Sequence, residues 1–241
     1  MYQNFIFDLY GTLVDISTNE NKPILWKKLS EFYGFHGADY HWKELKNTYH
    51  ELVKTELAQN TDYDYPEIDI TKIFLALYTQ KGVTASSELV MHTAQLFRIE
   101  STNFVRLYPG SMGTLLKLKE KGANIYLLSN AQRVFTEYEM RYLGIYDLFD
   151  GVLISSDEGC MKPDIAFFER ILNRYHLNKS DSIMIGNDRN SDMQGAKNAG
   201  LACCYIHTAS SSGTDAPKDV DYVIMDGDSM KLQEILLAHA G

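Results

Sequence analysis

Short apolar segments alternate with longer stretches of helical periodicity over most of this chain of 241 residues. Each apolar segment has three or four residues and ends beside polar residues or glycine: 4–7, 125–128, 152–154, 182–185 and 203–206. Short, continuously apolar runs are typical of strands that are buried on both faces. Between two of them, one apolar stripe at helical spacing predicts a helix that packs on a sheet, namely Ile165, Phe168, Ile171, Leu172 and Tyr175. This alternation predicts an α/β fold with a parallel sheet.

The alternation is interrupted between residues 15 and 106. Helical periodicity dominates there, without segments that indicate strands, in 25–33, 40–57, 70–81 and 88–104. We therefore predict a helical cap domain at 15–106, inserted into a Rossmann-like α/β core domain that is formed by 1–14 and 107–241. The polar residues 17–21 and the turn at 108–110 would be the two connections between the domains.

The charge of the chain restricts its partners. A formal net charge of −9 argues against nucleic acid and against a membrane surface, since both are polyanions. The chain has neither an apolar stretch of membrane-spanning length nor a leader with a basic start, so we expect a cytoplasmic protein. A small anionic substrate remains the expected partner, because it needs only a local positive site.

Polar side chains follow the predicted strands, where each strand ends. In open α/β sheets ligands bind beyond the carboxyl ends of the strands, so these side chains are the candidates for a site. The candidates come after the first four strands, and the last of them opens a helix: Asp8, Ser129, Asn130, Lys162, Asp188 and Asp192.

In this order, the candidates resemble the motifs of the haloacid dehalogenase superfamily. Residues 8–12, Asp-Leu-Tyr-Gly-Thr, resemble its first motif, Ser129 its second, Lys162 its third, and Asp188 with Asp192 its acidic fourth. Helices inserted directly after the first motif resemble the C1-type cap of that superfamily. The resemblance implies a hydrolase whose cap closes over the site.

The residue types suit covalent catalysis. The carboxylate of Asp8 would attack the substrate and form an ester intermediate, which divides one difficult displacement into two easier steps. Lys162 would neutralise an anionic substrate and restrain Asp8, while Ser129 and the backbone N–H at Asn130 would orient the oxygens of the substrate. Gly11 and Thr12 of the first motif complete the predicted substrate-binding set.

A magnesium ion is the predicted cofactor. Mg²⁺ prefers oxygen ligands and is usually held by one or two carboxylates together with water and substrate oxygens, a role that Asp8 and Asp188 would fill. The resemblance adds the backbone carbonyl of Tyr10 as a ligand. Asp192 would be a further ligand, or it would fix Lys162 from outside the metal shell.

Tyr10 departs from the usual phosphatase of this superfamily, which carries an aspartate there as general acid and base. A phenol with a pKa of about 10 is a poor substitute for a carboxylate with a pKa of about 4, so phosphomutase activity is disfavoured. The superfamily's L-2-haloacid dehalogenases resemble this chain at that position, since they have tyrosine in place of the second aspartate. A halide leaves without a proton, so it needs no general acid. Those enzymes work without metal, use a cap arginine, and have a tyrosine where this chain has Phe168.

We therefore predict a Mg²⁺-dependent phosphohydrolase of a small phosphorylated metabolite. One alternative is a metal-independent hydrolase that acts on 2-haloacids. Another is a weakly catalytic protein that binds a phosphorylated metabolite or a partner. The sequence leaves the role of the Tyr10 side chain open between catalysis and packing under the cap, and it predicts a solvated helix charge for Arg98.

Overall fold

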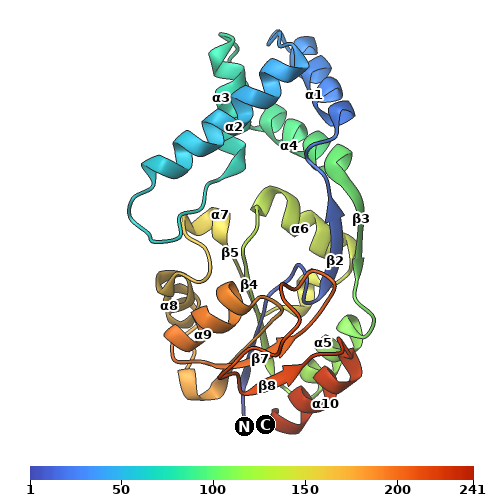
Figure 1. Cartoon of the computed structure of the whole chain (residues 1–241), viewed down its shortest axis with the longest axis vertical. Helices are drawn as coiled ribbons and strands as arrows, with labels where there is room; N and C mark the ends of the chain where they lie inside the picture. The colour runs from blue at the N-terminus through green and yellow to red at the C-terminus, as the bar shows by residue number, and fades with distance from the viewer.

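A six-stranded parallel sheet forms the lower part of the computed structural model, which describes all 241 residues (Figure 1). The strand order is β5-β4-β1-β6-β7-β8. The predicted α/β fold is confirmed, with every predicted strand in place: β1 (Asn4–Phe7), β4 (Asn124–Ser129), β5 (Gly151–Ile154), β6 (Ser182–Gly186), β7 (Ala202–Ile206) and a last strand β8 (Tyr222–Ile224). Phe7 of the central β1 is level with Leu127 and Ile185 of its two neighbours. The carboxyl ends of β1, β4 and β6 therefore lie together.

Helices cover both faces of the sheet because the residues of the buried strands alternate between two apolar clusters. Phe5 and Phe7 pack with Leu118 of α5 and Leu236 of α10, whereas Ile6 packs with Ile171 of α8 on the other face. The helices of this part are α5 (Ser111–Glu120), α6 (Arg133–Tyr142), α7 (Ser155–Glu158), α8 (Ile165–Arg174), α9 (Gly195–Asn198) and α10 (Ser229–His239), with short helical turns at Tyr146–Leu148, Lys179–Asp181 and Arg189–Gln194.

Four helices form the upper part of the molecule in Figure 1: α1 (Pro23–Phe35), α2 (Trp42–Gln59), α3 (Ile70–Gln80) and α4 (Ser87–Ser101). They have an apolar core distinct from those on the sheet, with 17 buried residues, among them Trp26, Tyr33, Phe74 and Phe97. All of these residues except Phe135 of α6 belong to the inserted segment. A separate core is what an inserted domain requires. The division that we place between residues 14 and 15 and between 106 and 107 stays a prediction.

Two strands join the upper and lower parts, and the expectation of an insertion without strands is wrong. β2 (Val14–Thr18) pairs antiparallel with β3 (Thr102–Leu107). The helix expected at 88–104 ends at Ser101, because the hydroxyls of Ser101 and Thr102 both donate to the Arg98 carbonyl and β-prone residues follow. Only Val14 of these strands is fully buried, so neither strand has the continuous apolar run that marks the strands of the sheet.

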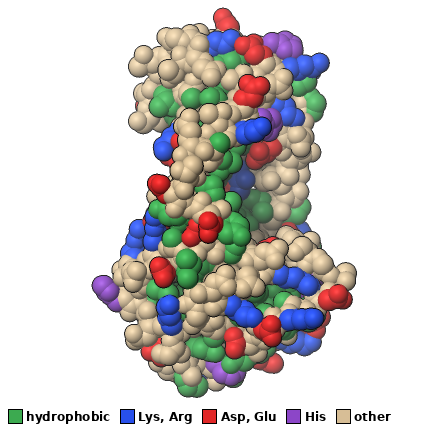
Figure 2. All heavy atoms as spheres, turned by 60° about the vertical axis from the view of Figure 1, so that its left-hand side comes forward, with side chains coloured by type: hydrophobic (Ala, Val, Ile, Leu, Met, Phe, Trp, Pro, Cys, Tyr) green, Lys and Arg blue, Asp and Glu red, His purple; other side chains and the backbone are tan.

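The loop between α2 and α3 returns to the core and makes a second attachment. Asn60 Nδ2 donates to the Gly159 carbonyl over 2.7 Å, and the Met161 N–H donates to the Tyr65 carbonyl over 3.0 Å. Figure 1 shows this loop descending beside α7 and α8. Figure 2 shows a hollow between the two parts, with hydrophobic side chains around it. The segment 159–161, which leads to Lys162, is therefore held by the loop between α2 and α3.

No helix in the structure combines the length and the apolar character that crossing a membrane would require.

Candidate active site

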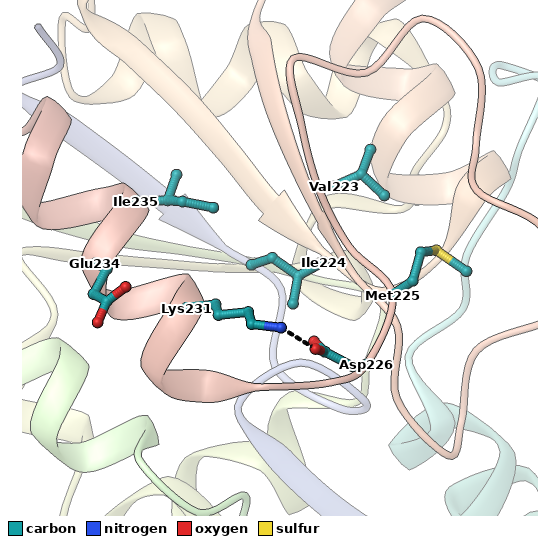
Figure 3. Close-up of a pocket in the computed structure, with 7 residues that line it drawn as sticks. All are labelled: Val223, Ile224, Met225, Asp226, Lys231, Glu234 and Ile235. Atoms are coloured by element: carbon teal, nitrogen blue, oxygen red, sulfur yellow. Dashed lines mark hydrogen bonds and ion pairs between the residues drawn. The ribbon is translucent and has the colours of Figure 1, made fainter.

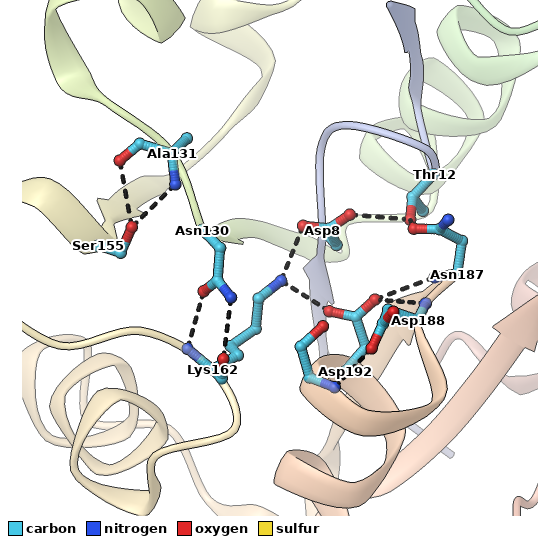
Figure 4. Close-up of polar contacts among 10 residues, drawn as sticks. Asp8, Thr12, Asn130, Ala131, Ser155, Lys162, Asn187, Asp188 and Asp192 are labelled. Atoms are coloured by element: carbon cyan, nitrogen blue, oxygen red, sulfur yellow. Dashed lines mark hydrogen bonds and ion pairs between the residues drawn. The ribbon is translucent and has the colours of Figure 1, made fainter. Parts of the chain in front are cut away.

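Asp8 lies at the carboxyl end of β1, where the loops after β1, β4 and β6 meet (Figure 4). Its N–H donates to the Ile185 carbonyl, which continues the pairing of β1 with β6 by one residue. One carboxylate oxygen, Oδ1, accepts from Lys162 Nζ over 2.7 Å, and Oδ2 accepts from Thr12 Oγ1 over 3.1 Å. Asp8 is 7% exposed. These bonds fix the carboxylate within the opening of the site.

Lys162 is buried between two carboxylates, since its Nζ lies 2.7 Å from Asp8 Oδ1 and 2.7 Å from Asp192 Oδ1. Burial opposes the charge of Lys162, but Asp192 and Asp8 outweigh it, so the pKa of the ammonium is raised. Burial also raises the pKa of Asp192 to about 6, against the opposing attraction of Lys162. The three groups form one buried charge network with Lys162 at its centre.

Asp192 uses both of its oxygens to support this network. Oδ1 bonds Lys162, while Oδ2 accepts from the N–H of Asn187 over 3.0 Å and from that of Asp188 over 2.9 Å. Of the two roles expected for Asp192, this geometry favours the one in which it fixes Lys162 over the one in which it binds metal.

The side chain of Asn130 holds the backbone of Lys162. Its Nδ2 donates to the Lys162 carbonyl over 2.9 Å, and its Oδ1 accepts from the Lys162 N–H over 2.8 Å. The hydroxyl of Ser129 is buried without a hydrogen-bond partner. A buried hydroxyl of this kind costs about 1–3 kcal/mol when it stays unpaired. Ser129 itself does not line the cavity at Asp8, whereas its neighbour Asn130 does. Sequence reasoning missed the side-chain role of Asn130.

Oxygen atoms at the mouth of the site fit a hard cation. The Tyr10 carbonyl accepts no hydrogen bond, and Asp188 uses only Oδ1, which accepts from the N–H groups of Asn190 and Ser191. Together with Asp8, these atoms match the ligand preference of Mg²⁺. No three acidic, histidine or cysteine side chains converge on a metal position, so water and substrate oxygens would have to complete the shell.

The hydroxyl of Tyr10 is used elsewhere. It donates to Glu139 Oε2 over 2.5 Å and also lies 3.2 Å from Thr136 Oγ1, both on α6. Burial, and then the charge of Glu139, raise the pKa of Tyr10 far above its ordinary value. A phenol that is already donating and has a raised pKa is poorly suited to give or take a proton at the substrate.

Arg98 of α4 is not the solvated helix charge that the sequence predicts. Its Nε lies 2.6 Å from Glu139 Oε1 and its Nη2 lies 3.1 Å from Glu139 Oε2. The side chains of Arg98 and Glu139 are only 18% and 6% exposed. The sequence offers no signal for this pair, since its members lie 41 positions apart in the inserted helices and the core.

Gly11 and Thr12 contact Asn187, which sequence reasoning did not include in the site. Thr12 Oγ1 lies 3.3 Å from Asn187 Oδ1, and Asn187 is buried at the end of β6. Gly11 has φ +88°, and a Cβ there would lie 2.5 Å from Asn187 Nδ2. Only glycine fits this approach. The position of Asn187 directly after Gly186, beside Asp188, was the available signal.

Gly11→Ala is expected to lower both stability and activity. The left-handed backbone alone costs a non-glycine residue about 1–2 kcal/mol, and displacement of Asn187 adds to that cost. Denaturant unfolding and kcat/KM would measure the two effects. Gly122→Ala is the matched control, because Gly122 has φ +78° and nothing within 4 Å of the new Cβ. Equal losses in stability and activity for the two variants would contradict a special role for the contact with Asn187.

A larger cavity lies at the edge of the sheet, away from these loops. Between β8 and α10 (Figure 3), it has a volume of 330 Å³, compared with 200 Å³ at Asp8. Among its charged side chains, Lys231 pairs with Asp226, and it contains no buried carboxylate. It therefore lacks the groups that covalent chemistry needs, so cavity size does not identify the site in this protein.

Comparisons with known proteins agree with the superfamily that the sequence resembles. Residues 2–200 match a family described as haloacid dehalogenase-like hydrolase. A glyceraldehyde 3-phosphate phosphatase of Pyrococcus furiosus is 28% identical over 91% of this chain and 88% of its own. One from Methanothermobacter thermautotrophicus is 34% identical, and that match spans 55% of this chain and 59% of the relative. A solved 2-haloacid dehalogenase of Pseudomonas syringae has a TM-score of 0.65 at 20% identity, over 99% of both chains, which shows the shared fold.

Proposed function

Because this chain belongs to the haloacid dehalogenase-like hydrolase family, we propose that it is a Mg²⁺-dependent phosphohydrolase of a small phosphorylated metabolite. The observation that carries this proposal is the arrangement around Asp8. A buried carboxylate bonds Lys162, and a second carboxylate, Asp188, and the Tyr10 carbonyl leave oxygen atoms open beside it. Carboxylates outnumber the lysine there, so the site attracts a cation.

In the proposed reaction, a carboxylate oxygen of Asp8 attacks phosphorus. The bond between phosphorus and the substrate oxygen breaks, and the leaving alkoxide takes a proton from water. Water then attacks phosphorus in the aspartyl phosphate, which releases inorganic phosphate and restores Asp8. Lys162 holds Asp8 in place throughout. We assign to the unpaired Ser129 hydroxyl the role of donor to a phosphate oxygen. Mg²⁺ held by Asp8, Asp188 and the Tyr10 carbonyl would neutralise phosphate charge.

Two features support a small sugar phosphate as the substrate. The relatives from Pyrococcus furiosus and Methanothermobacter thermautotrophicus are both named for glyceraldehyde 3-phosphate. The cavity at Asp8 is also small and polar, with a volume of 200 Å³. Because no general acid stands at position 10, turnover should depend strongly on the leaving group, by a factor of the order of the 10²–10⁴ that such an acid supplies.

A metal-independent 2-haloacid dehalogenase is the second candidate, and Tyr10 is the observation that favours it. The contacts of Tyr10 weaken this candidate, since its hydroxyl donates to Glu139 rather than standing free. Arg98 is paired with the same Glu139, so this cap arginine is not free to receive a halide ion. The phosphohydrolase accounts better for the open oxygens beside Asp8.

Assays on an aryl phosphate and on a 2-haloacid, each with Mg²⁺ and with chelator, separate the candidates. We expect phosphate release that requires Mg²⁺, and a rate for the aryl phosphate that exceeds the rate for an alkyl phosphate by about 10²-fold or more. Halide release that persists in chelator would overturn the proposal. Inactivity on both substrates would favour a binding protein.

Single turnover in H₂¹⁸O provides an independent criterion. Attack of water on phosphorus places ¹⁸O in inorganic phosphate and leaves Asp8 unlabelled. An alkyl ester of Asp8, as a dehalogenase would form, is opened at the carboxyl carbon, which places ¹⁸O in Asp8. Mass spectrometry of the peptide that contains Asp8 reads this label directly.

A further inference from the structure

We propose that Tyr10 is a positioning residue, which links the nucleophile loop to the inserted helices through Glu139 and Arg98. The inference deepens the proposed function, since the Tyr10 carbonyl is one of the oxygens assigned to Mg²⁺. It concerns the side chain of Tyr10, for which the proposed chemistry has no use.

The three residues form a continuous polar chain between separate parts of the fold. Tyr10 follows Asp8 by two positions and Glu139 lies on α6 of the core. Arg98 lies on α4, four positions before Thr102, where β3 begins. Glu139 Oε2 accepts from both partners, over 2.5 Å from the Tyr10 hydroxyl and 3.1 Å from Arg98 Nη2. Displacement of α4 would therefore remove the group that fixes Glu139.

Stacking adds to these bonds. The guanidinium carbon of Arg98 lies 5.8 Å from the centre of the Tyr10 ring and 5.0 Å from that of Phe135. A cation within about 6 Å of an aromatic ring is attracted to its face. Arg98 thus contacts Tyr10 directly as well as through Glu139, and the side chains of Arg98 and Glu139 are largely buried.

The loop that Tyr10 belongs to is compact, because backbone hydrogen bonds close it on both sides of Tyr10. The Leu9 carbonyl accepts from the N–H groups of Thr12, Leu13 and Val14, and the Gly11 N–H donates to the Val14 carbonyl. Asp8 and Thr12 are joined across the same loop. A displacement of the Tyr10 backbone would therefore move the Tyr10 carbonyl together with Thr12, the donor to Asp8.

Hydrogen exchange of the apoprotein tests the link without metal or substrate. Exchange of the amides of residues 11–14 is expected to rise about 10-fold in Arg98→Gln and in Tyr10→Phe, as loss of a hydrogen bond to a charged group implies. The effect of the double variant should fall short of the sum of the two single effects, because both substitutions act on the contacts of Glu139. Glu100→Gln is the control, since Glu100 lies on α4 but pairs with Lys28 within the inserted helices.

The outcomes are distinct. Wild-type exchange of residues 11–14 in Arg98→Gln, or additive effects in the double variant, would overturn the link. A rise confined to peptides of α4 would do the same, because it would mean that Arg98 stabilises only its own helix.

Magnesium titration adds a readout that a merely structural contact would not move. Calorimetry with Mg²⁺ alone is expected to show about 10-fold weaker binding to folded Tyr10→Phe than to wild type. In a separate kinetic assay, the pH profile of kcat/KM for Tyr10→Phe should be the same as that of wild type. A shifted pH profile would show proton transfer by Tyr10 and overturn the positioning role. If wild type takes up no Mg²⁺, the proposed function fails, while the exchange experiment still decides the link between Arg98 and Tyr10.

Discussion

Asp8→Asn is expected to lower kcat for an aryl phosphate by about 10⁴-fold or more, the size of loss seen when a covalent nucleophile is removed. An amide cannot form the acyl phosphate, yet its oxygen can still accept from Lys162 at the place of Asp8 Oδ1. The variant should therefore fold normally. Steady-state kinetics, with circular dichroism to check folding, would measure the effect.

Asp15→Asn is the matched control for this substitution. Asp15 belongs to the same N-terminal segment, but it lies on β2 and pairs with Arg106 on the neighbouring strand β3, away from Lys162. It should retain kcat within about threefold of wild type, as expected when an exposed pair is lost. If Asp8→Asn kept more than a tenth of wild-type turnover, Asp8 would not be the nucleophile, and the site would need another explanation.

Lys162→Met is expected to destabilise the protein by about 3–5 kcal/mol at neutral pH, which is the usual cost of removing one member of a buried ion pair. Asp8 and Asp192 would then face each other without the ammonium that lies 2.7 Å from both. Methionine preserves most of the volume, so lost charge rather than a cavity should dominate. Urea unfolding followed by fluorescence would give the change in the free energy of unfolding.

Lys119→Met shows what an exposed pair contributes. Lys119 and Asp150 are each about a third exposed in their pair, so its loss should cost less than about 1 kcal/mol. The double variant Lys162→Met/Asp192→Asn should recover part of the stability, because it removes one of the two unpaired carboxylates. A Lys162→Met protein as stable as Lys119→Met would mean that the charge network contributes little to folding.

Local patterns in the chain were sufficient to predict the sheet and the list of candidate residues. A buried strand such as Asn4–Phe7 is marked by a nearly continuous apolar run. The helices between the strands explain why neighbouring strands run parallel. In a parallel sheet, the residues that follow the strands all lie at the carboxyl ends of the strands, on the same side of the sheet. Asp8 and Lys162 meet there for that reason. Their catalytic roles stay predictions.

The ribbon of β2 and β3 and the role of Asn187 were not predictable in the same way. Each ribbon strand is stabilised by its partner, which lies far along the chain, so the local pattern is weak. Asn187 acquires its importance from the absence of a side chain at Gly11, a contact that depends on how two loops approach each other. Periodicity reports which residues are buried, whereas such contacts depend on the packing of whole elements.

The sequence by itself determined the α/β core, the helical insertion and the place of Asp8, because these depend on apolar patterns and on the ends of parallel strands. The tertiary structure alone decided what Tyr10 contacts. Its partner Glu139 lies 129 positions away, and Arg98 reaches that carboxylate from the inserted helices. The packing of α4 against α6 brings these polar groups together, and no local pattern encodes that packing.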